Sequence, residues 1–205
     1  MIGVMQMHRL VQLPVCLSDD MPSFRETALI DAAAALAAQM QSLTGDDRIP
    51  ALVTSSGLVA WRFLNAAAAL CETDKPRFCE WGSGIGSVSC LAALRGWKVT
   101  GIEIEPRLVA VARKFAADHG VTVRFVEGSY RPDALYGGGR AETSVTDHDR
   151  FDPFAFDIIY IYAWPAEKQA VTEMIARHGR SGAIFMRYGG GVTCEAFRVV
   201  ASPEW

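Results

Sequence analysis

Three alternating glycines, Gly82, Gly84 and Gly86, constrain the fold of this chain more than any other feature of its sequence. They follow a short segment of strand character at residues 78–81 and precede a helical segment that runs to about residue 94. Because glycine has no Cβ, the backbone can turn sharply here and approach a ligand closely. The helix behind the turn adds free amides and the positive end of its dipole. This order of elements predicts a ligand-binding turn at the carboxyl edge of a sheet.

Strands and helices alternate from residue 77 onward. The segments of strand character cover residues 78–81, 99–103, 121–126, 156–162 and 183–187, and the helical segments among them cover 87–94, 106–119 and 165–178. The strand segments are almost continuously apolar, which is typical of a parallel sheet with helices on both faces. We therefore predict an α/β fold with a Rossmann-like, mostly parallel central sheet.

Two helices are expected ahead of this alternation. Ser23 and Glu26 have the spacing of a capping box, which predicts a helix from Ser23 to about Leu43. A second helix starts at residue 55 or 56 and presents one apolar face as far as Cys71. We expect these helices to form an N-terminal cap on the α/β core.

The length of 205 residues suits one domain, and hydrophobic residues make up 50% of it, enough for a sizeable core. We divide the domain into a helical cap at 1–72, a cofactor-binding core at 77–188 and a C-terminal strand segment at 189–205. Residues 8–15 give a weak strand signal. The connection at 129–155 is unusually long, which leaves a solvated loop and a substrate-facing lid as alternatives.

A carboxylate, Glu103, ends the second predicted strand, at the same edge of the sheet as the glycine turn. It can accept hydrogen bonds from both hydroxyls of an adenosine ribose. The third glycine of a dinucleotide fingerprint would fall at Ser87, and the chain has neither a P-loop sequence nor a Tyr-x-x-x-Lys pair. A nucleoside cofactor is therefore expected, with nicotinamide-dependent oxidation as the weaker alternative.

Glu80, two residues before the first glycine, extends the motif to Glu-x-Gly-x-Gly-x-Gly. With this motif, Glu103 and the order of strands, residues 77–130 resemble the class I S-adenosylmethionine-dependent methyltransferases, and a looser resemblance continues to about residue 187. The resemblance implies that Glu80 orients the amino group of the cofactor, that Glu103 holds its ribose and that Ile104 packs on its adenine. It also implies that the methionyl part of the cofactor lies over Gly82, Ser83, Gly84, Ile85 and Gly86.

The sequence departs from that family at three places. In many family members an acidic residue after the third strand, in the context Gly-Asp, contacts the adenine of the cofactor. This sequence has Gly128-Ser129 there, so any contact would use Ser129. The Asn/Asp-Pro-Pro-Tyr sequence of many amino-group methyltransferases is replaced by Tyr162-Ala163-Trp164-Pro165, which disfavours nucleic-acid bases and glutamine as acceptors. The family's antiparallel hairpin after strand five also has little chain left to form it. Residues 197–200 can supply one of its strands, and the N-terminal segment or a shorter sheet would account for the other.

Methyl transfer from a sulfonium depends mainly on alignment and exclusion of water, so no catalytic residue is compulsory. The candidates for the pocket are Tyr160, Tyr162 and Trp164, whose rings can face a sulfonium or form the wall of a substrate pocket. The two-residue period places Tyr160 and Tyr162 on one face of the strand, and Tyr160 has a core position as its alternative. No His or Cys pair has the spacing of a metal site.

Composition narrows the classes of acceptor and the cellular compartment that we expect. The net charge of −3 offers no basic stripe for a phosphate backbone, which disfavours nucleic acid as a partner. The five separated cysteines, the absence of a signal sequence and the absence of a membrane-length apolar run indicate a cytoplasmic protein. We expect a methyltransferase for a small-molecule acceptor, with a protein side chain second. A protein that binds S-adenosylmethionine without turnover is the alternative from another class. The sequence leaves the oligomeric state open.

Overall fold

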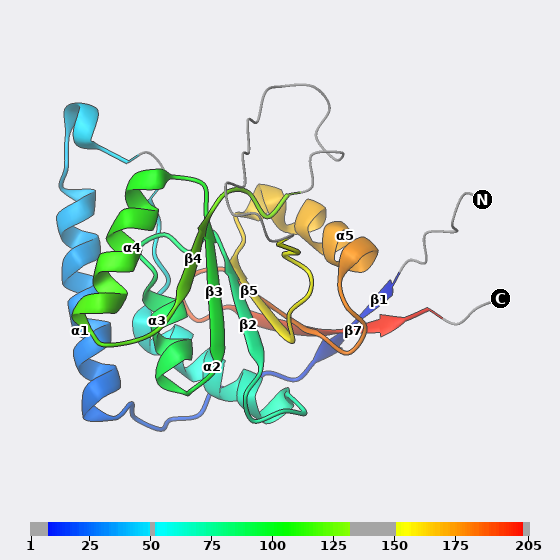
Figure 1. Ribbon diagram of the computed structural model, residues 1–205. Helices are drawn as coiled ribbons and strands as arrows, with labels where there is room; N and C mark the ends of the chain where they lie inside the picture. Colours follow the sequence, from blue (N-terminus) through cyan, green and yellow to red (C-terminus); the bar gives the residue numbers. More distant parts are fainter. Residues whose placement is uncertain (1–7, 50–51, 132–150, 203–205) are drawn as a thin grey trace.

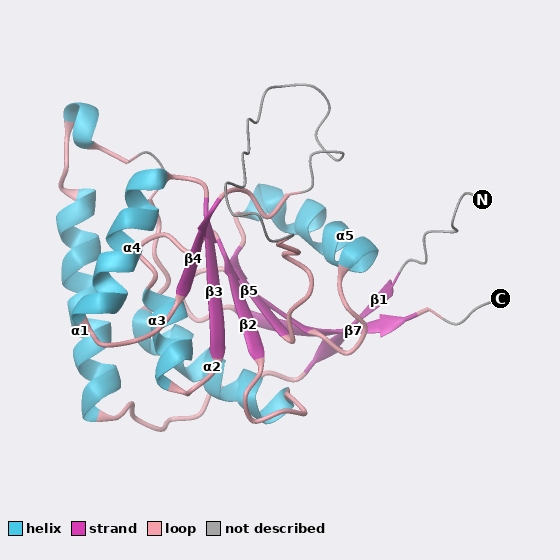
Figure 2. Cartoon of the chain, viewed as in Figure 1, coloured by secondary structure: helices cyan, strands magenta, loops and turns pink. Residues whose placement is uncertain are grey.

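A central sheet organises the computed structural model, which describes residues 8–49, 52–131 and 151–202 (Figures 1 and 2). Over these residues the sheet has seven strands, in the order β1-β7-β6-β5-β2-β3-β4. The strands are β1 (His8–Leu13), β2 (Arg77–Trp81), β3 (Lys98–Glu103), β4 (Arg124–Glu127), β5 (Ile158–Tyr162), β6 (Ile184–Tyr188) and β7 (Cys194–Ala201). Strands β2 to β6 pair in parallel, β7 is antiparallel to β6, and β1 is antiparallel to β7. The predicted mostly parallel sheet is confirmed.

Helices cover both faces of this sheet, as predicted (Figure 1). They are α1 (Phe24–Gln41), α2 (Gly57–Leu70), α3 (Ser87–Leu94), α4 (Pro106–Asp118) and α5 (Lys168–His178), with short 3-10 turns η1 (Gly45–Asp47) and η3 (Pro165–Glu167). Buried side chains of α1 to α4 pack with one face of the sheet, and those of α5 pack with the other. Among the described residues, no helix combines the length and the hydropathy that a membrane crossing requires.

The apolar run of β5 explains the two-layer core. Ile158 and Tyr160 point to the α1–α4 side, while Ile159 and Ile161 point to the α5 side, so alternate residues fill opposite layers. All four are buried. A strand covered on both faces needs apolar side chains at every position, which is what the continuous apolar pattern predicted.

The start of α1 follows from its capping box. The Ser23 hydroxyl accepts a hydrogen bond from the Glu26 amide at 3.3 Å, and the Glu26 carboxylate accepts one from the Ser23 amide at 2.8 Å. Two of the free amides at the helix start are thereby satisfied. The predicted capping box is confirmed, and the helix ends at Gln41, two residues before the predicted end.

The edge of the sheet beyond β6 is built from both ends of the chain. β7 supplies the antiparallel neighbour of β6, and β1 pairs with it from His8 opposite Ala201 to Leu13 opposite Ala196. The N-terminal segment therefore provides the strand next to β7, one of the two alternatives that the sequence left open. Most of the long connection predicted at 129–155, namely 132–150, lies outside the described residues.

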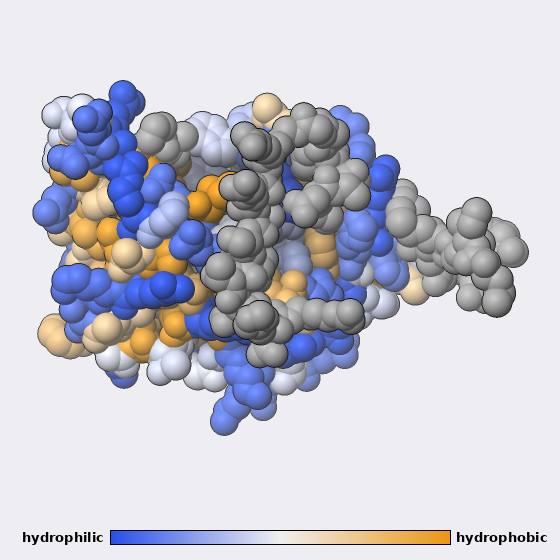
Figure 3. All heavy atoms as spheres, turned by 45° about the horizontal axis from the view of Figure 1, so that its top comes forward, coloured by the Kyte–Doolittle hydropathy of each residue, from blue (hydrophilic) through white to orange (hydrophobic). Residues whose placement is uncertain are grey.

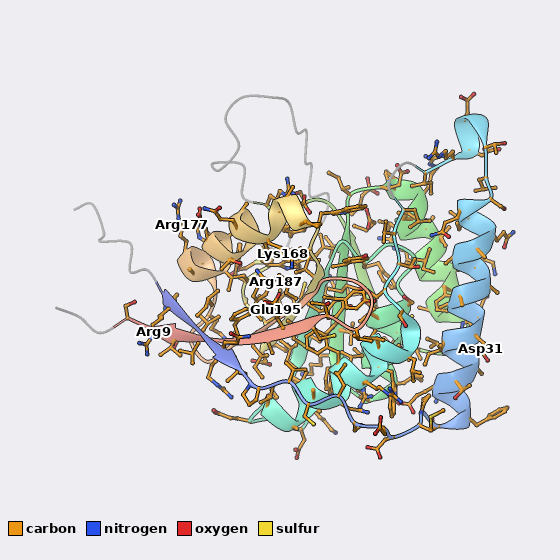
Figure 4. The ribbon with its side chains drawn as sticks, turned by 180° about the vertical axis from the view of Figure 1, so that it is seen from behind. Arg9, Asp31, Lys168, Arg177, Arg187 and Glu195 are labelled. Atoms are coloured by element: carbon orange, nitrogen blue, oxygen red, sulfur yellow. The ribbon has the colours of Figure 1, made fainter. Side chains whose placement is uncertain are left out.

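A charged cluster joins the β6–β7 hairpin to the start of α5 (Figure 4). Arg187 donates from Nε to Glu195 Oε2 at 3.0 Å and from Nη1 to Thr172 Oγ1 at 2.8 Å. Lys168 Nζ lies 4.0 Å from the same Glu195 oxygen. Because Arg187 is largely buried, its charge needs these partners, and they fix the hairpin relative to α5.

Candidate functional site

A cleft lies where the parallel strands β2, β3, β4 and β5 end, at the top of Figure 1. It consists of two adjoining cavities of about 440 and 320 Å³, which share Gly82, Glu103, Ile104, Tyr130 and Glu167 in their walls. These volumes fall in the range of small-molecule sites. Figure 3 turns this edge toward the reader and shows hydrophobic residues between hydrophilic ones at the surface. The carboxyl edge of a parallel sheet is the expected place for a ligand.

The floor of the cleft is bare backbone. Gly82 and Gly84 follow β2 with φ angles of 70° and 53°. Among the residues that the structure describes, a Cβ at Gly82 would meet no atom within 4 Å, and one at Gly84 would meet only the Leu52 side chain, at 3.9 Å. Both glycines therefore border open space into which any side chain would project.

Gly86 has a different reason to lack a side chain. It has a φ of 80° at the start of α3, and a Cβ there would lie 2.7 Å from Phe125 Cζ and 3.0 Å from Ala112 Cβ. Both contacts lie inside the protein, on the side of α4 and β4. Glycine at this position lets the start of α3 pack against these neighbours.

Glu103 forms the wall opposite the glycine turn. Its Oε2 accepts a hydrogen bond from the Gly84 amide at 2.8 Å, and its Oε1 accepts one from the Glu105 amide at 3.0 Å. A carboxylate offers about four lone-pair positions, so each oxygen keeps acceptor capacity after these two bonds. The residue is buried at 8% exposure yet lines both cavities. Its carboxylate therefore faces the cleft in a fixed orientation.

Glu80 lies behind the turn. Its Oε2 accepts hydrogen bonds from the Ser89 amide at 2.8 Å and the Ser89 hydroxyl at 2.6 Å, so it caps the first turn of α3. Burial raises the pKa of Glu80 to about 8, against the lowering effect of these two bonds. The contact between Glu80 and the amino group of a cofactor stays a prediction.

The side of the cleft beyond Glu103 carries mainly apolar side chains. Ile104 is 66% exposed, an unusual position for an isoleucine, and lines both cavities. Tyr130 stacks on Trp81, with ring centroids 4.7 Å apart and planes at 8°. Gly128 and Ser129 line the smaller cavity, where the Ser129 hydroxyl accepts a hydrogen bond from the Arg131 amide at 3.1 Å.

The predicted aromatic residues separate into two groups. Tyr162 and Trp164 line the larger cavity with nearly parallel rings, 6.3 Å apart. Tyr160 is buried at 1% exposure, packs edge-on against Phe63 and shares a hydrogen bond of 2.8 Å with Ser55. Burial raises the pKa of Tyr160, so its hydroxyl stays protonated. Tyr160 occupies the core position that was its alternative.

Two further residues of the turn, Ser83 and Ile85, are buried. Ser83 is buried and its amide donates to the Ile102 carbonyl at 2.8 Å. Ile85 is buried and lines a further cavity, on the α1 side of Tyr162. The structure thus brings Gly82, Gly84, Glu103, Ile104, Gly128, Ser129, Tyr162 and Trp164 into the cleft.

Several cleft residues were missed by the sequence reading. Trp81 lines the larger cavity of the cleft; its place at the end of a strand, just before the glycine turn, was the available signal. Tyr130 and Glu167 follow β4 and β5 and are held partly by the ion pair between Glu167 and Arg131. The segment between α1 and α2 contributes Leu52 and Val53 without any motif that marks them.

The family model of the methyltransferase domain matches residues 79–186, more than half of the chain. The chain belongs to this family. The match includes the glycine turn, Glu103 and β5, so the resemblance to class I S-adenosylmethionine-dependent methyltransferases is confirmed.

One relative matches a shorter part of the chain. A release factor glutamine methyltransferase from Deinococcus radiodurans is 35% identical over 71 residues, which are 34% of this chain and 26% of that protein. The matched segment is thus about a quarter of that relative's length.

Solved structures support the fold. An RNA methyltransferase from Salinibacter ruber, in complex with S-adenosyl-L-homocysteine, has a TM-score of 0.52 at 19% identity and covers 75% of this chain and 96% of its own. A putative RNA methyltransferase from Pyrococcus horikoshii has a TM-score of 0.50 at 13% identity and covers 82% and 98%. At these identities the likeness concerns the fold.

Proposed function

We propose that the protein transfers the methyl group of S-adenosylmethionine to a small-molecule acceptor. The observation that carries this proposal is the open space over Gly82 and Gly84, opposite the fixed carboxylate of Glu103. A side chain on either glycine would project into that space. The residues present therefore fit an adenosyl cofactor.

Each part of the donor has a candidate partner in the cleft. The free acceptor positions of Glu103 suit the two ribose hydroxyls. The exposed Ile104 suits one face of the adenine, and the Ser129 hydroxyl lies in the same smaller cavity. The glycine backbone supports the methionyl part, and Glu80 behind it is the candidate for the amino group.

The donor supplies an activated methyl group on a sulfonium, so the protein has to align the acceptor and exclude water. Alignment alone accounts for roughly 7–11 kcal/mol of a barrier. The rings of Tyr162 and Trp164, which line the larger cavity, suit both tasks and can face a cation. A dedicated base is not required by this proposal.

A small molecule is favoured over the acceptors named in the similar proteins. The residues at the end of β5 and after it are Tyr162-Ala163-Trp164-Pro165, without the Asn or Asp carbonyl that would accept a hydrogen bond from a planar amine. This argues against the glutamine acceptor of the Deinococcus relative. The net charge of −3 argues against RNA. A protein side chain other than glutamine is the second candidate.

Calorimetry with S-adenosylhomocysteine, followed by transfer of label from S-adenosylmethionine to a panel of acceptors, tests the proposal. We expect saturable binding of S-adenosylhomocysteine and a labelled product with a small-molecule acceptor. Binding without turnover on any acceptor would favour a non-catalytic binding protein. A thermal shift with NAD and none with S-adenosylhomocysteine would favour a nicotinamide-dependent oxidoreductase.

A further inference from the structure

A separate cavity lies outside the cleft, between α1, the start of α2 and the glycine turn. We call it the second cavity, because the two adjoining cavities described above together form the donor cleft. The volume of the second cavity is about 620 Å³. One wall is formed by the side of α1 that carries Ile30 and a series of alanines, among them Ala34 and Ala38. Alanine has no atoms beyond Cβ, so these positions leave the space next to α1 open.

This cavity adjoins the donor cleft at Tyr162, which lines both. The chain passes from one to the other at two places. Val53 lines the cleft and its neighbour Thr54 lines the second cavity, and the same holds for Gly84 and Ile85. A molecule in the second cavity is therefore next to the turn over which the methionyl part of the donor is proposed to lie.

The wall of the second cavity is uncharged. Among the described residues that line it, none is Asp, Glu, Lys, Arg or His; the polar groups come from Gln41 and from hydroxyls such as Thr54, Ser87 and Tyr188. The Tyr188 hydroxyl already donates to the Gly191 carbonyl at 2.9 Å. An ion placed here would lose water without gaining a partner of opposite charge. The cavity therefore suits an uncharged, mainly apolar molecule that makes a few hydrogen bonds.

We infer that this second cavity binds the methyl acceptor, and that the acceptor is an uncharged, mainly apolar small molecule. This inference rests on the proposed function. The nucleophilic atom of the acceptor forms a bond to the methyl carbon beside Tyr162 while the carbon–sulfur bond breaks. The electron pair of that bond stays on sulfur, which leaves S-adenosylhomocysteine, and the proton lost by the acceptor passes to water.

The α1 alanines allow a test that leaves the core intact. Ala34 and Ala38 line the cavity and are exposed at its mouth, so a phenylalanine at either position enters the space without displacing core residues. Ala35, also exposed on α1, is outside the cavity wall, and Ala35→Phe is the matched control. All three variants should bind S-adenosylhomocysteine as the wild type does, which also reports correct folding.

The probe is 2-naphthol, with 2-naphthoate as its charged counterpart, titrated by calorimetry into protein saturated with S-adenosylhomocysteine. We expect Ala34→Phe and Ala38→Phe to weaken 2-naphthol binding by about tenfold or more, with Ala35→Phe unchanged and 2-naphthoate bound at least about tenfold more weakly than 2-naphthol. No saturable naphthol binding, equal binding of naphthoate, or naphthol binding insensitive to the α1 variants overturns the inference. If S-adenosylhomocysteine itself does not bind, the proposed function fails instead.

Discussion

The buried carboxyl of Glu80 should make the stability of this protein fall as the pH rises through neutrality. In the folded protein its pKa is about 8, against an ordinary value of 4.5. Between these values the folded state holds a proton that the unfolded state has released, so the free energy of unfolding decreases with pH. One such proton corresponds to at most about 1.4 kcal/mol per pH unit. Over two units within the window, the loss is at most about 3 kcal/mol.

Glu80→Gln isolates this contribution. An amide oxygen can still accept the hydrogen bonds that Ser89 donates to the carboxylate, but it does not titrate. Urea unfolding of the cofactor-free proteins at several pH values between 5 and 8 gives the comparison. The variant should gain stability relative to wild type as the pH rises. Glu173→Gln, which replaces an exposed carboxyl on α5, is the control and measures how a change from Glu to Gln affects stability at a surface position. Parallel curves for wild type and Glu80→Gln would refute the reasoning.

The same pair of proteins tests the predicted contact of Glu80 with the donor. An ammonium group beside Glu80 favours its ionised form, so binding of S-adenosylhomocysteine should release a proton near pH 7. Calorimetry in buffers of different ionisation enthalpy measures that release. We expect it in the wild type and not in Glu80→Gln. Equal proton release in both would place the amino group elsewhere.

Three further predictions concern substitutions, two of them with a matched control variant. Glu103→Ala should weaken binding of S-adenosylhomocysteine by about 1–3 kcal/mol in calorimetry. The control is Glu127→Ala, at the paired position of the neighbouring strand, which should leave binding unchanged. An unchanged Kd for Glu103→Ala would remove Glu103 from the site. Gly96→Ala introduces only an unfavourable φ, at 77°, and should lower the free energy of unfolding in urea by about 1 kcal/mol. Gly86→Ala adds atomic overlap and should lower it by at least about 1 kcal/mol more. Equal losses in the two variants would contradict the packing argument. Ser23→Ala removes the capping hydroxyl and should cost about 1 kcal/mol by the same measurement, and an unchanged midpoint would mean that the cap contributes nothing.

The geometry of the glycine turn and Glu103, where the donor is proposed to bind, was predictable because its signals are local. Gly84 follows the first strand of a strand–helix–strand unit and Glu103 ends its second strand, and the carboxyl ends of parallel neighbours meet at one edge of the sheet. The direct hydrogen bond between the Gly84 amide and the Glu103 carboxylate follows from that topology. The same local reasoning predicted the Ser23 cap and the continuous apolar pattern of β5.

The remaining features depend on contacts between distant segments. Period-two alternation placed Tyr160 and Tyr162 on one face, but it does not say where α2 covers that face; Phe63 of α2 packs on Tyr160 and leaves Tyr162 at the cleft. Leu52, in the connection between α1 and α2, also lines the cleft. No periodicity in that connection marks its position.

The division between local and distant signals has a consequence for specificity. The family model matches residues 79–186, which contain the glycine turn, Glu103 and Tyr162. Most residues of the proposed acceptor cavity lie before that range, on α1 and between residues 54 and 58, and Tyr188 and Gly191 lie after it. Membership of the family therefore accounts for the glycine turn and Glu103, where the donor is proposed to bind, and not for the proposed acceptor cavity. The acceptor class has to be derived from the alanines of α1 and the uncharged wall beside Tyr162, where a single added side chain changes the space available.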